Sequence, residues 1–148
     1  MTSLVENKKA KFNYEILDKF EAGIELLGHE VKSLRNGRGS FEGAYIIVRG
    51  REAFIHGMNI PPYQPANTSA DYDPERLRKL MLSKKEIAEI AGFESKKGLT
   101  IVPIRVYNKG NKLKVEIAVA RGKKEFDKRD IIKKRETDRD IRRTLKGE

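Results

Sequence analysis

Residues 101–120, IVPIRVYNKGNKLKVEIAVA, contain two runs in which apolar side chains recur at every second position. Such alternation is typical of a strand with one buried face, because successive side chains in a strand point to opposite sides. Asn108-Lys109-Gly110-Asn111 separates the two runs and has the composition of a hairpin turn. This stretch predicts a β-hairpin and is the strongest fold signal in the chain.

Alternation upstream of this hairpin predicts further strands. Residues 12–27 hold either two strands or one long bent strand. Apolar runs at 44–48 and 53–58 flank a turn around Gly50 and predict a second hairpin. Residues 59–73 are rich in proline and have almost no apolar periodicity, so they are expected to form a surface loop.

Helical spacing of apolar residues predicts two short helices among these strands. The first covers roughly 28–36 and is expected to carry Glu30, Lys32 and Arg35 outward. The second begins at the sequence Ser-Lys-Lys-Glu, which has the spacing of a capping box, and covers about 83–91.

A third short helix is predicted to follow Asp73-Pro74, because an aspartate before a proline is a frequent helix start. In this helix some side chains are expected to project outward and others to turn inward. The outward set is Arg76, Arg78 and Lys79, and the inward set is Leu77, Leu80 and Met81.

Hairpins with inserted helices favour a mainly β fold, a small antiparallel OB-like barrel with inserted short helices and a basic C-terminal tail. Residues 1–125 are expected to form the OB-fold core. Residues 121–148 hold 12 lysines and arginines against 7 acids. Because 126–148 offer few apolar anchors, this tail is expected to be disordered alone and helical when bound.

The composition narrows the possible functions. A net charge of +10 indicates a polyanionic partner, with nucleic acid the first candidate. The chain has no apolar run long enough to span a membrane and no signal-peptide pattern, so it is expected to be cytoplasmic. It has no cysteine and only two histidines, and neither histidine belongs to a catalytic motif. No metal, no cofactor and no enzyme activity are therefore expected.

The basic residues fall into groups that could share one face. They are Lys8, Lys9 and Lys11; Lys32 and Arg35; and Arg121, Lys123 and Lys124. A run of charged residues is often only a solvated surface. Composition alone therefore does not decide between nucleic-acid contact and a solvated surface.

Several segments resemble one protein family closely. The most specific are GxEVKSLRxG at 28–37 and GKKxxDKR at 122–129. Further matches, in the same order as in the family, are Asn7-Lys8-Lys9-Ala10, FEAGI at 20–24, Glu52-Ala53-Phe54, and Asp73-Pro74 with Arg76 and Arg78-Lys79-Leu80. Through these motifs, which cover nearly the whole chain, the sequence resembles the SsrA-binding proteins, also called small protein B or SmpB.

The resemblance implies a bacterial, non-enzymatic RNA-binding factor of trans-translation, the pathway that rescues stalled ribosomes. Proteins of this family bind the tRNA-like domain of transfer-messenger RNA (tmRNA). With elongation factor Tu and GTP they help to bring it to the A site. Their tail is expected to become helical in the decoding region and the empty mRNA channel. The GTPase activity belongs to the elongation factor.

The basic groups and the resemblance together predict the contact residues. RNA binding is expected at Asn7, Lys8, Lys9, Glu30, Lys32, Arg35, Lys123 and Lys124. Ribosome contact is expected at Asp127, Lys128, Arg129, Lys133, Lys134 and Arg135. Glu30, as an outward acceptor, would take a base or ribose hydroxyl, and Glu30→Ala would then weaken RNA binding with little loss of stability. A pairing of Glu30 within its own helix is the competing interpretation.

A different class of function stays open beside this one. A general single-stranded nucleic-acid-binding OB module would have the same charge, but it would need several exposed aromatic side chains on which bases stack. The alternation instead puts most aromatic residues at inward strand positions.

Overall fold

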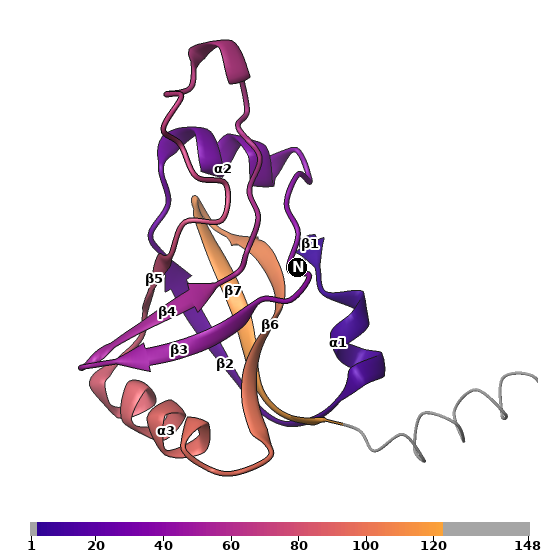
Figure 1. The fold of residues 1–148 in the computed structure, drawn as a ribbon, viewed down its shortest axis with the longest axis vertical. Coiled ribbons are helices and arrows are strands. Elements are labelled where there is room, and N and C mark those ends of the chain that lie inside the picture. The colour runs from indigo at the N-terminus through magenta and orange to yellow at the C-terminus, as the bar shows by residue number, and fades with distance from the viewer. Residues whose placement is uncertain (1–2, 123–148) are drawn as a thin grey trace, which may run out of the picture.

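The computed structural model describes residues 3–122, apart from the Lys11 side chain. Within this range, seven strands form one antiparallel sheet in the order β1-β6-β7-β2-β5-β4-β3 (Figure 1). The strands are β1 (Ser3–Glu6), β2 (Tyr14–Ile24), β3 (Tyr45–Arg49), β4 (Glu52–His56), β5 (Arg78–Met81), β6 (Leu99–Lys109) and β7 (Lys112–Gly122). The predicted mainly β, antiparallel fold with short inserted helices is confirmed.

The hairpin predicted from 101–120 is formed by β6 and β7. Asn108 pairs with Leu113 and Lys109 with Lys112, and Gly110 in the turn has a φ of 63°. Such a positive φ costs glycine little because it has no Cβ. The second predicted hairpin is formed by β3 and β4, and residues 12–27 contribute the single long strand β2.

The sheet curves into a barrel-like shape, because β3 at one edge lies close to β6 near the other edge. Every strand contributes a buried apolar side chain to the interior, from Val5 on β1 to Ile46 on β3. On β6 both Ile101 and Val106 face this core, although five positions separate them. A bulge between Pro103 and Arg105 makes this possible by shifting the register of β6 by one residue.

A second, smaller core lies on the other side of β6 and β7, and a helix that the sequence did not predict covers it. Helix α1 (Lys8–Asn13) inserts Ala10, which is 2% exposed. Its neighbours in this cluster are Val102, Ile104, Ala118 and Ala120. The expectation of a strand from residue 12 was therefore wrong at its start, since β2 begins only after α1 ends.

Two predicted helices are confirmed. Helix α2 is Gly28–Arg35, and α3 is Lys84–Glu94, which begins at the capping box of Ser83 and Glu86. Helix α3 extends beyond its predicted end by continuing through Gly92. The loop at 59–73 passes over α2 and contains the short 3₁₀ helix η1 (Pro65–Asn67) (Figure 1).

The helix predicted after Asp73-Pro74 is wrong. The chain makes a turn there, in which the Glu75 N–H donates to the Asp73 carboxylate at 2.9 Å, and then enters strand β5. Arg78 and Leu80 point inward from β5 and are buried, whereas Leu77 and Met81 are exposed. Pairing of β5 with both β2 and β4 stabilises the strand. No local sequence pattern indicates which strands β5 pairs with.

Candidate nucleic-acid interface

The first predicted basic group lies on α1. Asn7 is its N-cap, and the Asn7 side chain accepts from the Ala10 N–H at 3.3 Å and donates to the Pro103 carbonyl at 2.9 Å. This side chain therefore fastens α1 to β6. Lys8 is exposed, and Lys9 pairs with Glu42 at 2.7 Å. Because the two partners of that ion pair are largely exposed, the pair contributes little and leaves Lys9 available to another anion.

The second basic group lies on α2. Lys32 is exposed and its Nζ lies 5.9 Å from the centre of the Tyr63 ring. Arg35 is also exposed and donates from Nη2 to the Asn111 carbonyl in the β6–β7 turn at 3.1 Å. Ser33 is buried and donates to the Pro61 carbonyl at 2.7 Å. The helix thus contacts the loop through Ser33 and Lys32, while Lys32 and Arg35 stay exposed.

The structure does not bring the basic groups together in one patch. Helix α1 ends where Tyr14 pairs with Gly122, at the end of β7, and Arg121 is next to it. Arg35 instead contacts the turn that precedes β7. An 11-residue strand therefore separates the two groups, and a strand rises about 3.3 Å per residue. Figure 1 shows α2 across one end of the barrel and α1 along its side. Lys123, Lys124 and the predicted tail contacts lie outside the described residues.

Glu30 lies at the centre of a buried polar network rather than on the surface. It is 0% exposed. Its Oε1 accepts from Arg76 Nη2 at 2.5 Å and from the Leu27 N–H at 2.7 Å. Its Oε2 accepts from Arg78 Nη2 at 2.7 Å and from the Tyr72 hydroxyl at 2.9 Å. Two arginines and a tyrosine from distant segments thus converge on one carboxylate.

Arg78 is also completely buried, and its remaining donors are satisfied. Its Nη1 donates to the Met58 carbonyl at 2.7 Å, and its Nη2 donates to the Pro74 carbonyl at 2.9 Å. A buried guanidinium needs such partners because an unpaired charge in the interior is costly. The network therefore joins α2, the 59–73 loop and β5 into one unit.

The electrostatics of the network favour an ionised Glu30. Burial raises the pKa of Glu30, but hydrogen bonds from Arg76, the Leu27 N–H and Arg78 outweigh burial and hold the pKa at about 2. Burial, followed by the hydrogen bond to Glu30, raises the pKa of Tyr72 to about 12. The carboxylate is charged and the phenol neutral throughout the physiological range.

The expectation that Glu30 and Arg78 point outward is wrong, and so is the interpretation of Glu30 as paired with Lys32 or Arg35 of its own helix. The arginine partners of Glu30 are 46 and 48 positions away along the chain. Two features of the sequence could have indicated this burial. Glu30 is the single acid among the cations of its helix, and Arg78 lies two positions from Leu80, on the same face of a strand. The burial of Glu30 also reverses the expectation that Glu30→Ala would leave stability intact.

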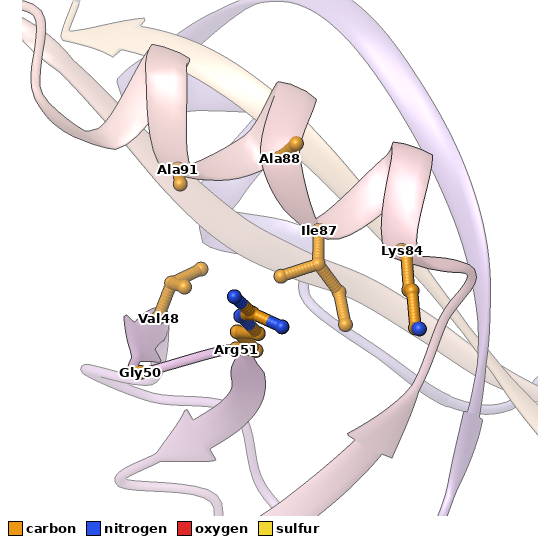
Figure 2. A pocket seen from close by; sticks show the side chains of 7 residues that line it. All are labelled: Val48, Gly50, Arg51, Lys84, Ile87, Ala88 and Ala91. Carbon is orange, nitrogen blue, oxygen red and sulfur yellow. The ribbon is translucent and has the colours of Figure 1, made fainter.

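Two cavities on the described part of the chain lie near candidate or control residues. One of about 240 Å³ lies beside α1 and is lined by Asn7, Lys9 and Tyr45 among others. A second, of about 330 Å³, lies between α3 and the β3–β4 turn; Figure 2 shows Arg51 and Lys84 at this cavity with Val48, Ile87, Ala88 and Ala91. None of the residues predicted to bind RNA lines the cavity in Figure 2.

Residues 3–122 contain neither a cluster of metal ligands nor a membrane-spanning helix. No three histidine, aspartate or glutamate side chains converge as a set of metal ligands there. No helix in this range is long and apolar enough to cross a membrane.

Comparison with known proteins identifies the family. A family profile described as "SmpB protein" matches residues 4–147. The chain is 52% identical over 139 residues to the SsrA-binding protein of Solidesulfovibrio magneticus, covering 94% of this chain and 90% of that protein. It is 46% identical over 145 residues to the SsrA-binding protein of Synechococcus sp. strain JA-3-3Ab, covering 98% and 94%.

A solved structure is similar in both sequence and fold. It is described as "tmRNA-SmpB: a journey to the center of the bacterial ribosome". One chain of it superimposes with a TM-score of 0.69 at 43% identity, covering 81% of this chain and 84% of that one. The chain therefore belongs to the SmpB protein family, whose curated relatives carry the name SsrA-binding protein.

Proposed function

We propose that this chain binds the tRNA-like domain of tmRNA and promotes the arrival of that RNA in stalled ribosomes during trans-translation. One observation carries the proposal: the family match over 4–147 together with the structural likeness to a chain described with tmRNA and the bacterial ribosome. A ribosomal partner also supports a cytoplasmic location.

The physical character of the surface supports this function. The net charge of +10 favours a polyanion, and exposed lysines and arginines lie both at one end of the barrel and along its side. The chain acts as a binding factor rather than an enzyme. In this proposal GTP hydrolysis belongs to elongation factor Tu, which accompanies the RNA.

The proposed RNA contacts follow from exposure. Lys8, Lys9, Lys32 and Arg35 offer accessible cations to phosphates, and Lys123 and Lys124 extend the set beyond the described residues. Asn7 and Glu30 are occupied by bonds within the chain, so we assign them a positioning role. Asn7 holds α1 in place, and Glu30 holds Arg76 and the loop above α2.

The tail is proposed to act at the ribosome rather than on the free RNA. Residues 126–148 contribute the family motif Asp127-Lys128-Arg129 and the cations Lys133, Lys134 and Arg135. Segments of this composition can fold on RNA, with cations following the phosphates. We propose that they contact the A site and the mRNA channel.

The alternative, a general single-strand-binding module, is less well supported. Such a module uses several exposed aromatic platforms. Among residues 3–122, Tyr45 is the one aromatic side chain that ranks as an exposed large hydrophobic residue, and its ring already lies 4.9 Å from that of His56. Bases would find few free stacking surfaces.

Tagging of stalled ribosomes tests the proposal. A reconstituted translation system with tmRNA, elongation factor Tu and ribosomes stalled on an mRNA without a stop codon should append the tag only when the chain is added. A chain of similar size and charge, such as lysozyme, is the control. Tagging that proceeds equally well without the chain would refute the proposed function.

A further inference from the structure

A pocket beside α1 lies where the described part of the chain ends. Its volume is about 240 Å³, below the ~300 to 1,000 Å³ that is typical of small-molecule sites, and suits one large side chain. Helix α1, the start of β2, the segment that leads into β3, and β6 form its walls. Its aromatic residues are Tyr14, Phe41 and Tyr45, and its small apolar residues are Ala10, Ala44 and Val102.

The pocket extends the smaller core that α1 covers. Ala10 and Val102 belong to that core and are each 2% exposed, and Tyr14 packs against it. Tyr45, which also lines the pocket, is 40% exposed. A buried apolar floor beside an exposed aromatic wall favours an aromatic occupant, because aromatic rings pack well edge to face or in offset stacks.

The last described residue lies next to this pocket. Gly122 pairs with Tyr14, and Ala120, two positions earlier on β7, pairs with Thr100. Tyr14 and Thr100 both line the pocket. Phe126 is the only aromatic residue that follows Gly122 in the sequence. Four residues can span up to about 14 Å, so the Phe126 ring is within reach of the pocket.

The charges at the pocket complement the sequence around Phe126. Phe126 stands between two acids, Glu125 and Asp127. Lys9 lines the pocket and pairs with Glu42 at 2.7 Å. The side chains of that pair are 70% and 73% exposed, so the pair is weak and another carboxylate can compete for Lys9.

We propose that Phe126 occupies this pocket in the RNA-free protein, with Glu125 and Asp127 beside Lys9. The contact involves only the first residues of the tail. Its consequence rests on the proposed function: RNA phosphates compete with the two acids for Lys9, so RNA binding at α1 releases the tail for its role at the ribosome.

Backbone NMR of the full chain tests the contact with the natural side chain. Phe126→Ala should shift the amide resonances of Ala10 and Tyr45 at the pocket. Leu145→Ala removes an apolar side chain near the end of the tail and should leave both amides in place. The amide of Ala88, at the cavity in Figure 2, is the internal reference. Pocket amides that do not respond to Phe126→Ala would overturn the docking.

Fluorescence measures the same contact and its dependence on charge. The chain has no tryptophan, so Phe126→Trp and Leu145→Trp each introduce a single reporter. We expect acrylamide to quench the first about threefold less efficiently than the second, because the pocket shields the ring from solvent. Adding Lys9→Glu to Phe126→Trp should remove most of this protection, whereas Lys84→Glu at the control cavity should not. Equal quenching of the two reporters would count against the docking.

A transcript of the tRNA-like domain separates the contact from its consequence. At saturation, quenching of Phe126→Trp should rise to the level of Leu145→Trp, and protection that persists in the complex would overturn the release. Pocket amides that shift with the transcript but not with Phe126→Ala would instead assign the pocket to an RNA base and overturn the docking. A chain that shows the docking but does not bind the transcript would refute the proposed function alone.

Discussion

Glu30 shows how one buried carboxylate can organise a surface. Its two arginine partners come from the turn before β5 and from β5 itself, and the tyrosine comes from the loop over α2. Removing one partner of a buried ion pair leaves an uncompensated charge, which destabilises a protein far more than the intact pair stabilises it. The network therefore connects α2, the loop over it and β5 beneath the α2 surface.

The first prediction concerns the buried polar network of Glu30. Glu30→Gln keeps the shape but removes the charge that Arg76 and Arg78 face, so the free energy of unfolding should fall by about 3 kcal/mol. Urea unfolding followed by circular dichroism measures it. Glu75→Gln, at an exposed position four residues before Lys79, should change the value by less than ~0.5 kcal/mol. Equal stability of the two variants would return Glu30 to the surface role first expected for it.

The low pKa of Glu30 gives a second prediction. The folded pKa is about 2, against 4.5 for an unperturbed glutamate. Between these values the unfolded chain binds a proton that the folded chain does not, so this stabilisation is complete above about pH 5 and is lost as the pH falls toward 2. The difference in unfolding free energy between the unmodified chain and Glu30→Gln should shrink by about 2 kcal/mol from pH 7 to pH 3. A constant difference would mean that the carboxylate is not held by the arginines.

Helices and strands with signals inside a few residues were predicted from the sequence, and those that depend on distant contacts were not. The β6–β7 hairpin, α2 and the start of α3 depend on alternation, a turn or a cap within a few residues, and the sequence predicted them. Strand β5 depends on pairing with β2 and β4, and its Arg78 pairs with Glu30, 48 positions away, so a local proline signal was misleading. Helix α1 has only 6 residues, and among its described side chains Ala10 alone is strongly buried, which is too short a pattern to detect.

The same reasoning explains which features of the candidate site could be predicted from the sequence. Lys8, Lys9, Lys32 and Arg35 were identified from charge, and they are exposed as expected. Their separation onto the side and one end of the barrel depends on strand order, which composition does not encode.

A third prediction belongs to α1. Asn7→Ala removes both the cap on Ala10 and the bond to the Pro103 carbonyl, so we expect a loss of about 1 to 2 kcal/mol of stability. Thermal unfolding should detect it, and hydrogen exchange should show faster exchange in α1 than in β7. Asn108→Ala, at an exposed position near the β6–β7 turn, is the control. Unchanged exchange in α1 would indicate that the cap is dispensable.

A fourth prediction concerns the tail, whose residues lie outside the described part of the chain. Truncation after Glu125 should preserve the melting temperature and most affinity for the tRNA-like domain but abolish tagging on stalled ribosomes. Charge reversal at Lys128 and Arg129 should act in the same way. Full tagging by the truncated chain would show that the tail has no ribosomal role.

In the whole molecule, a β-barrel carries exposed cations at separate places. The C-terminal end of α1 and Arg35 of α2 lie at opposite ends of β7. A single RNA that contacts both must therefore span the length of that strand. Affinity should then depend on the three-dimensional shape of the RNA and on phosphate contacts, since side chains do not enter the deep groove of an A-form helix. Salt should weaken this binding steeply.

Competition binding tests this claim most directly. The labelled tRNA-like domain is bound to the full chain at ~150 mM salt and displaced by unlabelled tRNA-like RNA, by an unstructured RNA of equal length or by a duplex. We predict that the tRNA-like RNA displaces the probe at a concentration at least ~30-fold lower than either competitor, a difference that requires recognition of shape beyond charge. Equal displacement by the unstructured RNA would contradict the account and favour a general single-strand-binding module.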